Sequence, residues 1–375
     1  MKVLITGAHG FVGKNLRLRL SERKDVEVVT FGRHDDPAHL AALLRDVGFV
    51  FHLAGVNRPQ DPAEFETGNT GLTRQLCEAI AAGAASRSRP LPVIYTSSIQ
   101  AARDNPYGAS KLGAERVLAD AEARGELVAH QFRLPNIFGK WCRPNYNSAV
   151  ATFCHNISRD LPIQVNDPNA ALTLVYIDDV IERFLALFDG ADAQRDGEGF
   201  DRVSPQYTTT VGQVVDWLQR FKASRETLVT ERVGTGLLRA LYSTYVSYLP
   251  VEAFSYTVPA WVDRRGAFVE MLKTPDAGQF SYFTAHPGVT RGGHYHHSKT
   301  EKFLVIRGNA RFRFRHMETG QEYELLTQAT PPTIVETVPG WTHDITNIGN
   351  DEMIVMLWAN EIFDVARPDT YACPI

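Results

Sequence analysis

The sequence of 375 residues has few cysteines, no long apolar run and almost no excess of charge. Its four cysteines show no C-x-x-C spacing, which disfavours a disulfide framework and a thiolate metal site and fits a reducing, cytoplasmic location. No stretch approaches the ~20 apolar residues of a membrane span, and residues 3–5 are too short a run for a signal peptide. The formal net charge of -4 favours neither nucleic acid nor a membrane surface as partner. We therefore expect a small-molecule partner, no nucleic acid and no membrane insertion.

The first part of the chain alternates short β-branched runs with helical patterns, as βαβ units require. We expect parallel strands at residues 2–6, 26–31, 48–53, 92–97 and 127–132. We expect helices at residues 15–20, 38–44, 72–82, 108–121 and, further on, 211–221. These elements predict an α/β fold with a Rossmann-type, doubly wound parallel sheet.

The pattern changes at residues 242–250, after which short strands separated by Gly, Pro and Asn replace the helical patterns. Strands are expected at residues 301–306, 311–315, 333–338 and 353–358. The carboxyl-terminal part should therefore form an all-β barrel or sandwich. We place the first domain at residues 1–248 and the second at residues 256–375.

A glycine-rich turn follows the first expected strand. Gly7 permits the tight turn, Gly10 lets the backbone approach a pyrophosphate, and Gly13 lets the next helix pack closely on the sheet. The helix amino terminus, with Phe11 and Val12, offers N–H groups and positive dipole charge to phosphates. This context predicts a dinucleotide-binding site.

The end of the second expected strand indicates which dinucleotide binds. Arg33 stands where an acidic side chain would bind the ribose hydroxyls of NAD. A guanidinium can pair with a 2′-phosphate, so the sequence predicts NADPH. In the alternative interpretation Arg33 is a solvated loop residue, and Asp35 or Asp36 binds the ribose.

A tyrosine and a lysine form the candidate reductase centre. Tyr107 and Lys111 stand four residues apart on one helix face, behind the expected fourth strand. Carbonyl reduction needs a phenol that protonates the developing alkoxide and an ammonium group that lowers the phenol pKa. Ser98, with Ser97 as second choice, should hydrogen-bond the same oxygen. Without this context, a Tyr-x-x-x-Lys string more often marks an exposed helix pair.

Three histidines and a glutamate form a candidate metal site near the carboxyl terminus. His294 and His296 have the i, i+2 spacing that points both rings to one side of a strand. With Glu301 and His343 they offer three nitrogen donors and one carboxylate to a small divalent ion. Any one of these histidines alone could be an ordinary barrel side chain. The donor types do not choose between zinc, iron, manganese and nickel.

On these residues, the first two thirds of the chain resembles the extended short-chain dehydrogenase/reductase family. Further matching strings are HLAG at 52–55, RLPNIFG at 133–139 and YIDDV at 176–180. The resemblance implies a dinucleotide cofactor, with Leu53 and Ala54 in its site, and a nucleotide-linked sugar substrate. The expected substrate-binding residues are Asn136, Arg143, Asn145 and Asn147. Arg143 could equally be a surface ion-pair partner.

The carboxyl-terminal strings at 288–308 and 339–347 resemble the two cupin motifs, except that Pro339 and Gly340 are adjacent. The whole chain resembles the bifunctional CapF-type enzymes of capsular polysaccharide synthesis. The resemblance implies a zinc-bound cupin that epimerises C3 of UDP-2-acetamido-2,6-dideoxy-4-hexulose. It then implies NADPH-dependent reduction at C4 to UDP-2-acetamido-2,6-dideoxy-L-talose, on the route to N-acetyl-L-fucosamine, and a homodimer.

The chemistry orders these two steps. A 4-keto group acidifies the proton on C3, so epimerisation must precede the reduction that removes the ketone. His297, or Tyr295, is expected to move that proton. Two other functions stay open: a single-activity reductase whose cupin is a binding or dimerisation module, and a cofactor-sensing regulator, which Tyr107 and Lys111 disfavour.

Overall fold

The structure is a computed structural model that describes residues 1–375 except 260, 264–265, 269–270, 273, 275–277 and 362–365. The described residues form two compact units. The first unit comprises Met1–Ile137 and Thr173–Thr208, and the second comprises Phe138–Leu172 and Thr209–Ile375. The predicted domains, 1–248 and 256–375, follow the change in sequence character and stay a prediction.

The first unit contains a parallel sheet with strand order β2-β1-β3-β4-β5. Its strands are β1 (Lys2–Thr6), β2 (Glu27–Phe31), β3 (Phe49–His52), β4 (Leu91–Ser98) and β5 (Leu127–Leu134). All five strands predicted for this part of the chain are present. The strand order reverses at β1 and β3, and ligands of open α/β sheets bind outside the carboxyl ends of strands at such a switch point.

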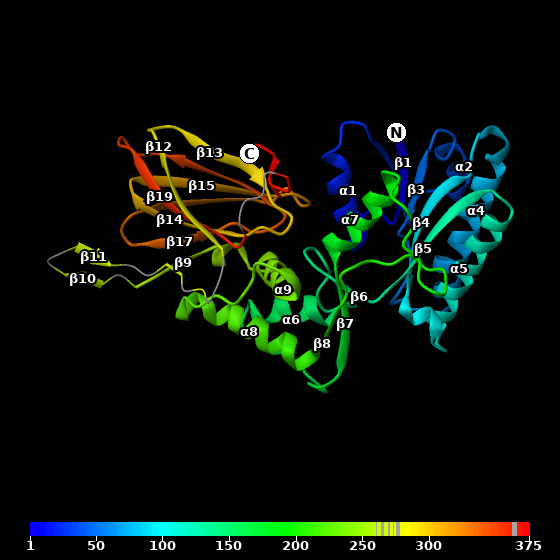
Figure 1. Ribbon diagram of the computed structural model, residues 1–375, viewed down its shortest axis with the longest axis horizontal. Helices are drawn as coiled ribbons and strands as arrows, with labels where there is room; N and C mark the ends of the chain where they lie inside the picture. Colours follow the sequence, from blue (N-terminus) through cyan, green and yellow to red (C-terminus); the bar gives the residue numbers. More distant parts are fainter. Residues whose placement is uncertain (260, 264–265, 269–270, 273, 275–277, 362–365) are drawn as a thin grey trace. The chain divides into compact units, whose positions relative to one another are not determined.

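Helices cover both faces of this sheet (Figure 1). One face carries α1 (Phe11–Ser21) and α7 (Ile177–Phe188), and the other carries α2 (Leu40–Leu43), α4 (Leu72–Ala82) and α5 (Pro106–Ala123). The ring of Phe184 on α7 lies 5.0 Å from that of Phe132 on β5. On the opposite face, Leu76, Ile80 and Leu118 are fully buried in the core. Because both faces are covered, the central strands β1 and β3 are almost entirely apolar and buried.

Smaller elements complete the first unit. The turns are η1 (Pro37–His39), η3 (Ala84–Ser86) and η4 (Ile99–Ala102). The short α3 (Ala63–Phe65) and the π-helix η2 (Glu66–Gly71) precede α4, and no sequence pattern predicted them. A three-stranded sheet of β6 (Asn136–Phe138), β7 (Ala171–Tyr176) and β8 (Tyr207–Thr210) lies where the chain passes from one unit to the other.

The second unit combines helices with an all-β domain. Its helical elements are α6 (Ala149–Ile157), α8 (Val211–Thr227), α9 (Gly236–Ser247) and the short η5 (Val251–Ala253). The described strands are β9 (Ser255–Thr257), β10 (Trp261–Asp263), β11 (Gly266–Phe268), β12 (Gln279–Ala285), β13 (Thr290–Tyr295), β14 (Glu301–Arg307), β15 (Asn309–His316), β16 (Glu322–Gln328), β17 (Thr333–Glu336), β18 (Trp341–Asn347), β19 (Met353–Ala359) and β20 (Tyr371–Ala372).

These strands confirm the predicted all-β part. Two antiparallel five-stranded sheets have the orders β12-β19-β14-β17-β9 and β16-β15-β18-β13-β20, while β10 and β11 form a separate pair. The rings of Phe303 on β14 and Phe312 on β15 lie 5.8 Å apart, which brings side chains of the two sheets into one core. In the part of the chain that the structure describes, we find no helix with the length and apolar character needed to cross a bilayer.

Candidate functional site

The glycine turn between β1 and α1 has no room for larger residues. Gly7 has φ +69°, and a Cβ on it would lie 2.6 Å from the backbone N of Ala54. A Cβ on Gly13 would lie 2.3 Å from the carbonyl oxygen of Gly7. Gly10 is the N-cap of α1 and has no side chain, so no N-cap side chain accepts a hydrogen bond from the first N–H groups of the helix. The turn is therefore shaped for a phosphate group at the switch point of the sheet.

The candidate ribose contacts lie after β2. The Arg33 side chain is 78% exposed and pairs with Glu64 at 2.9 Å. The Asp35 carboxylate accepts a hydrogen bond from Gly32 N at 2.7 Å, and that of Asp36 accepts one from Ala38 N at 2.9 Å. Both acids are thus engaged by nearby backbone, whereas an exposed ion pair such as that of Arg33 is weak and exchangeable. NADPH selection by Arg33 stays a prediction.

Helix α5 carries Tyr107 and Lys111 one turn apart. Asn105 caps the helix by accepting a hydrogen bond from Gly108 N at 2.8 Å, and Pro106 occupies the first turn. The buried Lys111 donates from Nζ to the carbonyl oxygen of Thr96 at 2.9 Å. Burial, opposed by the charge of Glu115, lowers the pKa of Lys111 to about 8. Tyr107 is half-buried.

The two serines at the end of β4 have different environments. The buried Ser97 donates to Glu115 at 2.5 Å, and Arg133 binds the same carboxylate with nitrogen–oxygen distances of 3.0 and 2.8 Å. The half-buried Ser98 accepts from Gln100 N at 3.1 Å and keeps its own hydrogen for donation. This difference supports the preference for Ser98 over Ser97.

Sequence reasoning missed Asn69 on the π-helix η2. This buried side chain accepts from Val56 N at 2.8 Å and donates to the Ser110 hydroxyl at 2.9 Å. A Cβ on Gly55 would lie 3.0 Å from both Asn69 Oδ1 and Lys111 Nζ, so the amide and the ammonium group flank the same glycine. An asparagine between two glycines ahead of a helical pattern was the available signal, and π-helical turns are frequent at functional sites.

The four expected substrate residues fall in different units. Asn136, on β6 in the first unit, is exposed and donates to the Thr173 carbonyl at 3.3 Å. Arg143, Asn145 and Asn147 lie between β6 and α6 in the second unit and are exposed. Their roles in substrate binding stay predictions.

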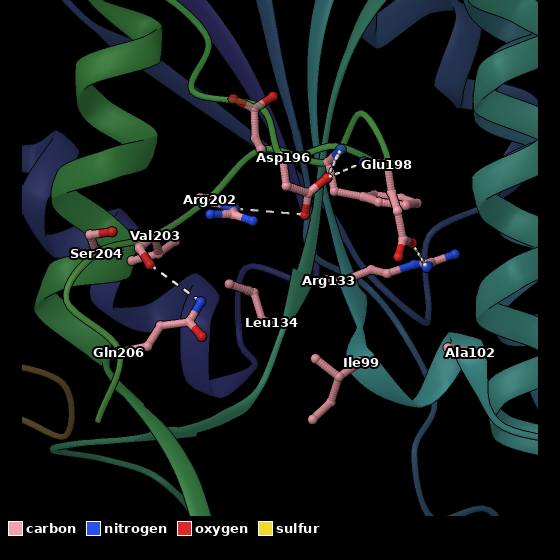
Figure 2. Close-up of a pocket in the computed structure, with 12 residues that line it drawn as sticks. Ile99, Ala102, Arg133, Leu134, Asp196, Glu198, Arg202, Val203, Ser204 and Gln206 are labelled. Atoms are coloured by element: carbon pink, nitrogen blue, oxygen red, sulfur yellow. Dashed lines mark hydrogen bonds and ion pairs between the residues drawn. The ribbon is translucent and has the colours of Figure 1, made fainter. Parts of the chain in front are cut away.

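A cavity of about 590 Å³ adjoins the carboxyl ends of β4 and β5 (Figure 2). Its walls are the turn that follows Ser98, the end of β5 and part of the segment 196–206. Arg133 pairs with Glu198 at 2.9 Å, and its guanidinium lies 3.9 Å from the ring centroid of Phe200. The charged groups here already bind one another, so we assign no ligand to this cavity.

The four candidate metal ligands converge in the barrel. One ligand atom each from His294, His296, Glu301 and His343 lies within 4.8 Å of the others. A β-bulge after Gly292, which has φ +96°, precedes His294. Bulges commonly re-aim side chains.

The chemistry of these groups fits a divalent ion. Burial, with His343 and His296 nearby, lowers the pKa of His294 to about 3, and burial also lowers that of His343. Neutral imidazoles are what a metal requires. Among the described residues, neither buried ring nitrogen of His343 has a hydrogen-bond partner, although its Nε2 lies 3.5 Å from Glu301 Oε2. An orphaned buried nitrogen needs a partner, and an ion at this point would supply one.

The expected proton carriers lie in a neighbouring aromatic cluster. The buried rings of Tyr295 and His297 are 5.5 Å apart, and both contact Tyr371, at 5.6 and 5.0 Å. His294 and Tyr295 are consecutive on β13, so their side chains point to opposite faces of the strand. The role of His297 or Tyr295 in proton transfer stays a prediction.

Comparisons with known proteins agree with this architecture. Residues 3–201 match the NAD dependent epimerase/dehydratase family, and residues 261–371 match the polysaccharide biosynthesis C-terminal domain. The chain therefore belongs to the NAD dependent epimerase/dehydratase family, with an added all-β domain. It is 59% identical over 378 residues to the UDP-2-acetamido-2,6-beta-L-arabino-hexul-4-ose reductase of Pseudomonas aeruginosa, covering 100% of this chain and 99% of the relative.

Solved structures support the same assignment. A crystal structure of the capsular polysaccharide assembling protein CapF from Staphylococcus aureus is 40% identical, covers 100% of both chains and has a TM-score of 0.68. The UDP-glucuronic acid 4-epimerase from Bacillus cereus in complex with NAD is 20% identical, covers 60% of this chain and 85% of the other, and has a TM-score of 0.51, which shows a shared fold. The predicted extended reductase fold, its all-β partner and the resemblance to CapF-type proteins are confirmed.

Proposed function

We propose that this chain is a bifunctional nucleotide-sugar enzyme. Its barrel inverts C3 of UDP-2-acetamido-2,6-dideoxy-4-hexulose, and its Rossmann unit then reduces C4 to give UDP-2-acetamido-2,6-dideoxy-L-talose, on the route to N-acetyl-L-fucosamine for capsule or O-antigen. One observation carries the proposal: a single chain holds both a Tyr–Lys pair on helix α5 of a Rossmann unit and a three-histidine, one-glutamate cluster in a β-barrel. The relative from Pseudomonas aeruginosa, named as a reductase of a UDP-linked 4-keto sugar, supports it.

The reductase half uses Ser98 at the end of β4 and Tyr107 and Lys111 on helix α5. Bound NADPH would supply the hydride to C4. Tyr107 donates the phenol proton to the developing alkoxide, and Ser98 donates a hydrogen bond to the same oxygen. Lys111 places positive charge one helical turn from the phenol, which favours release of its proton.

The epimerase half uses the barrel cluster. A bound divalent ion, with zinc as the predicted one, would stabilise negative charge that develops when C3 loses its proton. His294, His296, Glu301 and His343 would hold this ion, and His297 or Tyr295 removes and returns the proton. NADPH rather than NADH, a homodimer and a cytoplasmic location also remain predictions.

Deuterium exchange separates the two halves. The 4-keto sugar nucleotide is incubated with the protein in deuterated water without NADPH, and C3 is followed by NMR. We expect deuterium at C3 with the unchanged protein and with Tyr107→Phe, and none with His294→Ala. In a second assay with NADPH and the C3-epimerised ketose, His294→Ala should retain NADPH oxidation and Tyr107→Phe should lose it.

The alternative is a single-activity reductase whose barrel is a binding or dimerisation module, and the reductase name of the curated relative favours it. NADPH oxidation without any C3 exchange would establish this alternative. Exchange at C3 that survives His294→Ala would defeat the epimerase role of the barrel cluster. Failure to oxidise NADPH with any UDP-linked 4-keto hexose would defeat the whole proposal.

A further inference from the structure

The last residues of the chain lie along the strand that carries His294. We call residues 368–374 the carboxyl-terminal strap. Within the strap, β20 pairs antiparallel with β13, and Cys373 N donates to the Gly293 carbonyl at 2.7 Å. Arg315 holds the end of the strap by donating to the Pro374 carbonyl at 2.9 Å. The strap is thus an integral part of the sheet beside the candidate metal ligands.

The strap contacts the loop between β13 and β14 through Asp369, while Lys299 of that loop also donates from Nζ to the Pro368 carbonyl at 2.9 Å and to the Thr370 hydroxyl at 2.7 Å. One of the Asp369 carboxylate oxygens accepts from His297 N at 2.9 Å, and the other accepts from Ser298 N at 2.9 Å and Lys299 N at 2.8 Å. Three consecutive backbone amides on one carboxylate fix the main chain of Asp369 against this loop. Its backbone has φ +38°, a left-handed conformation that Asp tolerates better than most residues.

The carbonyl oxygen of Asp369 faces a candidate ligand. It lies 2.5 Å from Nδ1 of His296, whose Nε2 lies 3.1 Å from Glu301 Oε2. A carbonyl oxygen can only accept, so Nδ1 must carry the hydrogen. When His296 binds an ion, Nε2 is then the nitrogen that carries no hydrogen and offers its lone pair.

We propose that Asp369 is a positioning residue for the metal site: its carboxylate anchors the strap on the loop, and its carbonyl holds His296 in the tautomer whose Nε2 binds the ion. The inference rests on the metal site of the proposed function. Partners that orient a metal-binding histidine typically contribute about 10- to 100-fold to metal affinity. Asp369 therefore acts through His296 and need not touch the ion.

Metal affinity of the full-length protein tests this role. Co²⁺ and Zn²⁺ dissociation constants are measured by competition with a chelating dye, and the visible spectrum of the Co²⁺ form is recorded. Asp369→Gly keeps the backbone conformation accessible and removes the carboxylate, and we expect about 10- to 100-fold weaker binding and an altered Co²⁺ spectrum. Asp369→Asn retains one acceptor oxygen and should show an intermediate loss, which keeps the test available if the glycine variant folds poorly.

Two comparisons separate positioning from general stabilisation. Arg315→Ala loosens the far end of the strap, and we expect its Co²⁺ affinity to stay within about twofold, with thermal unfolding of each variant as the folding control. In a His296→Ala background, Asp369→Gly should cause no further loss. Equal losses of Co²⁺ affinity in Asp369→Gly and Arg315→Ala, or unchanged Co²⁺ affinity in Asp369→Gly, would overturn the role of Asp369 but leave the metal site of the proposed function standing. If the unchanged protein and His343→Ala bind Co²⁺ equally, the metal site itself fails.

Discussion

At the scale of the residue, neighbouring side chains of one type have separate tasks. Ser97 is buried and donates to Glu115, whose carboxylate also pairs with Arg133. Ser98 is the last residue of β4 and is half-buried. The sequence offered both serines as candidates for the alkoxide. The contacts of Ser97 indicate a structural role, whereas the hydroxyl of Ser98 can still donate, as the role proposed for it requires.

Replacing each serine by alanine should separate these roles. Ser98→Ala removes a donor to the developing alkoxide, so we expect kcat for NADPH-dependent reduction to fall by about 100-fold. Ser97→Ala leaves a buried carboxylate short of one hydrogen bond, so the free energy of unfolding should fall by about 1–3 kcal/mol while kcat stays within about threefold. Steady-state kinetics and urea unfolding of both variants measure this. Equal losses of kcat in the two variants would contradict the assignment.

At the scale of the element, two glycines with similar backbone dihedrals differ in how closely other residues pack against them. Gly7 and Gly125 have nearly the same dihedral, φ +69° and +72°. A Cβ on Gly7 would meet the backbone of Ala54, whereas a Cβ on Gly125 would meet nothing within 4 Å. An added side chain would therefore strain the backbone at both positions, but it would collide with neighbouring backbone only at Gly7.

An alanine at each glycine tests this distinction. Gly125→Ala should cost about 1–2 kcal/mol of stability for its left-handed backbone and leave NADPH affinity unchanged. Gly7→Ala must in addition displace the chain after β3 from the glycine turn, which we predict binds the phosphates of NADPH, so we expect at least about tenfold weaker NADPH binding. Fluorescence titration with NADPH and thermal unfolding provide the measurements. NADPH affinity that is the same in both variants would show that the turn does not contact the cofactor.

At the scale of the whole molecule, the second unit joins helices and barrel through buried charge. Lys302 on β14 pairs with Glu336 on β17, and Glu336 also binds Arg225 on α8 at 3.2 Å. Lys302 donates to the Tyr256 hydroxyl at 2.9 Å. Burial alone would lower the pKa of Lys302, but Glu336 raises it well above its usual value, so the pair stays ionised. This cluster explains why α8 belongs to the same compact unit as the barrel.

Breaking this pair should destabilise the second unit. Lys302→Met leaves the buried Glu336 with Arg225 as its remaining cation in the cluster, and we expect a loss of about 3–5 kcal/mol in the free energy of unfolding. Lys222→Met, which removes the cation of an exposed pair with Asp160, should cost less than about 1 kcal/mol. Urea unfolding of the full chain compares the two variants. Equal costs would mean that the buried cluster contributes no more than a surface pair.

Local pattern was sufficient for much of the fold. The strand at 2–6 and the helix at 72–82 appear with the predicted bounds, as Lys2–Thr6 and Leu72–Ala82. Apolar periodicity is a property of neighbouring residues, so it can be read without knowing the tertiary structure. The π-helix before α4 was not predicted, because its distinguishing hydrogen bonds leave no such period.

By itself, then, the sequence determined the two fold types and the chemical groups of both candidate centres, because turn glycines, strand alternation and donor types are encoded within short segments. Only the tertiary structure decided which groups meet. It placed α8 and α9 in one unit with the barrel, Asn69 against Ser110, and the strap carbonyl of Asp369 on His296. These contacts join residues 41 to 73 positions apart, and hydrogen-bond partners at such separation follow from packing, which no local pattern records.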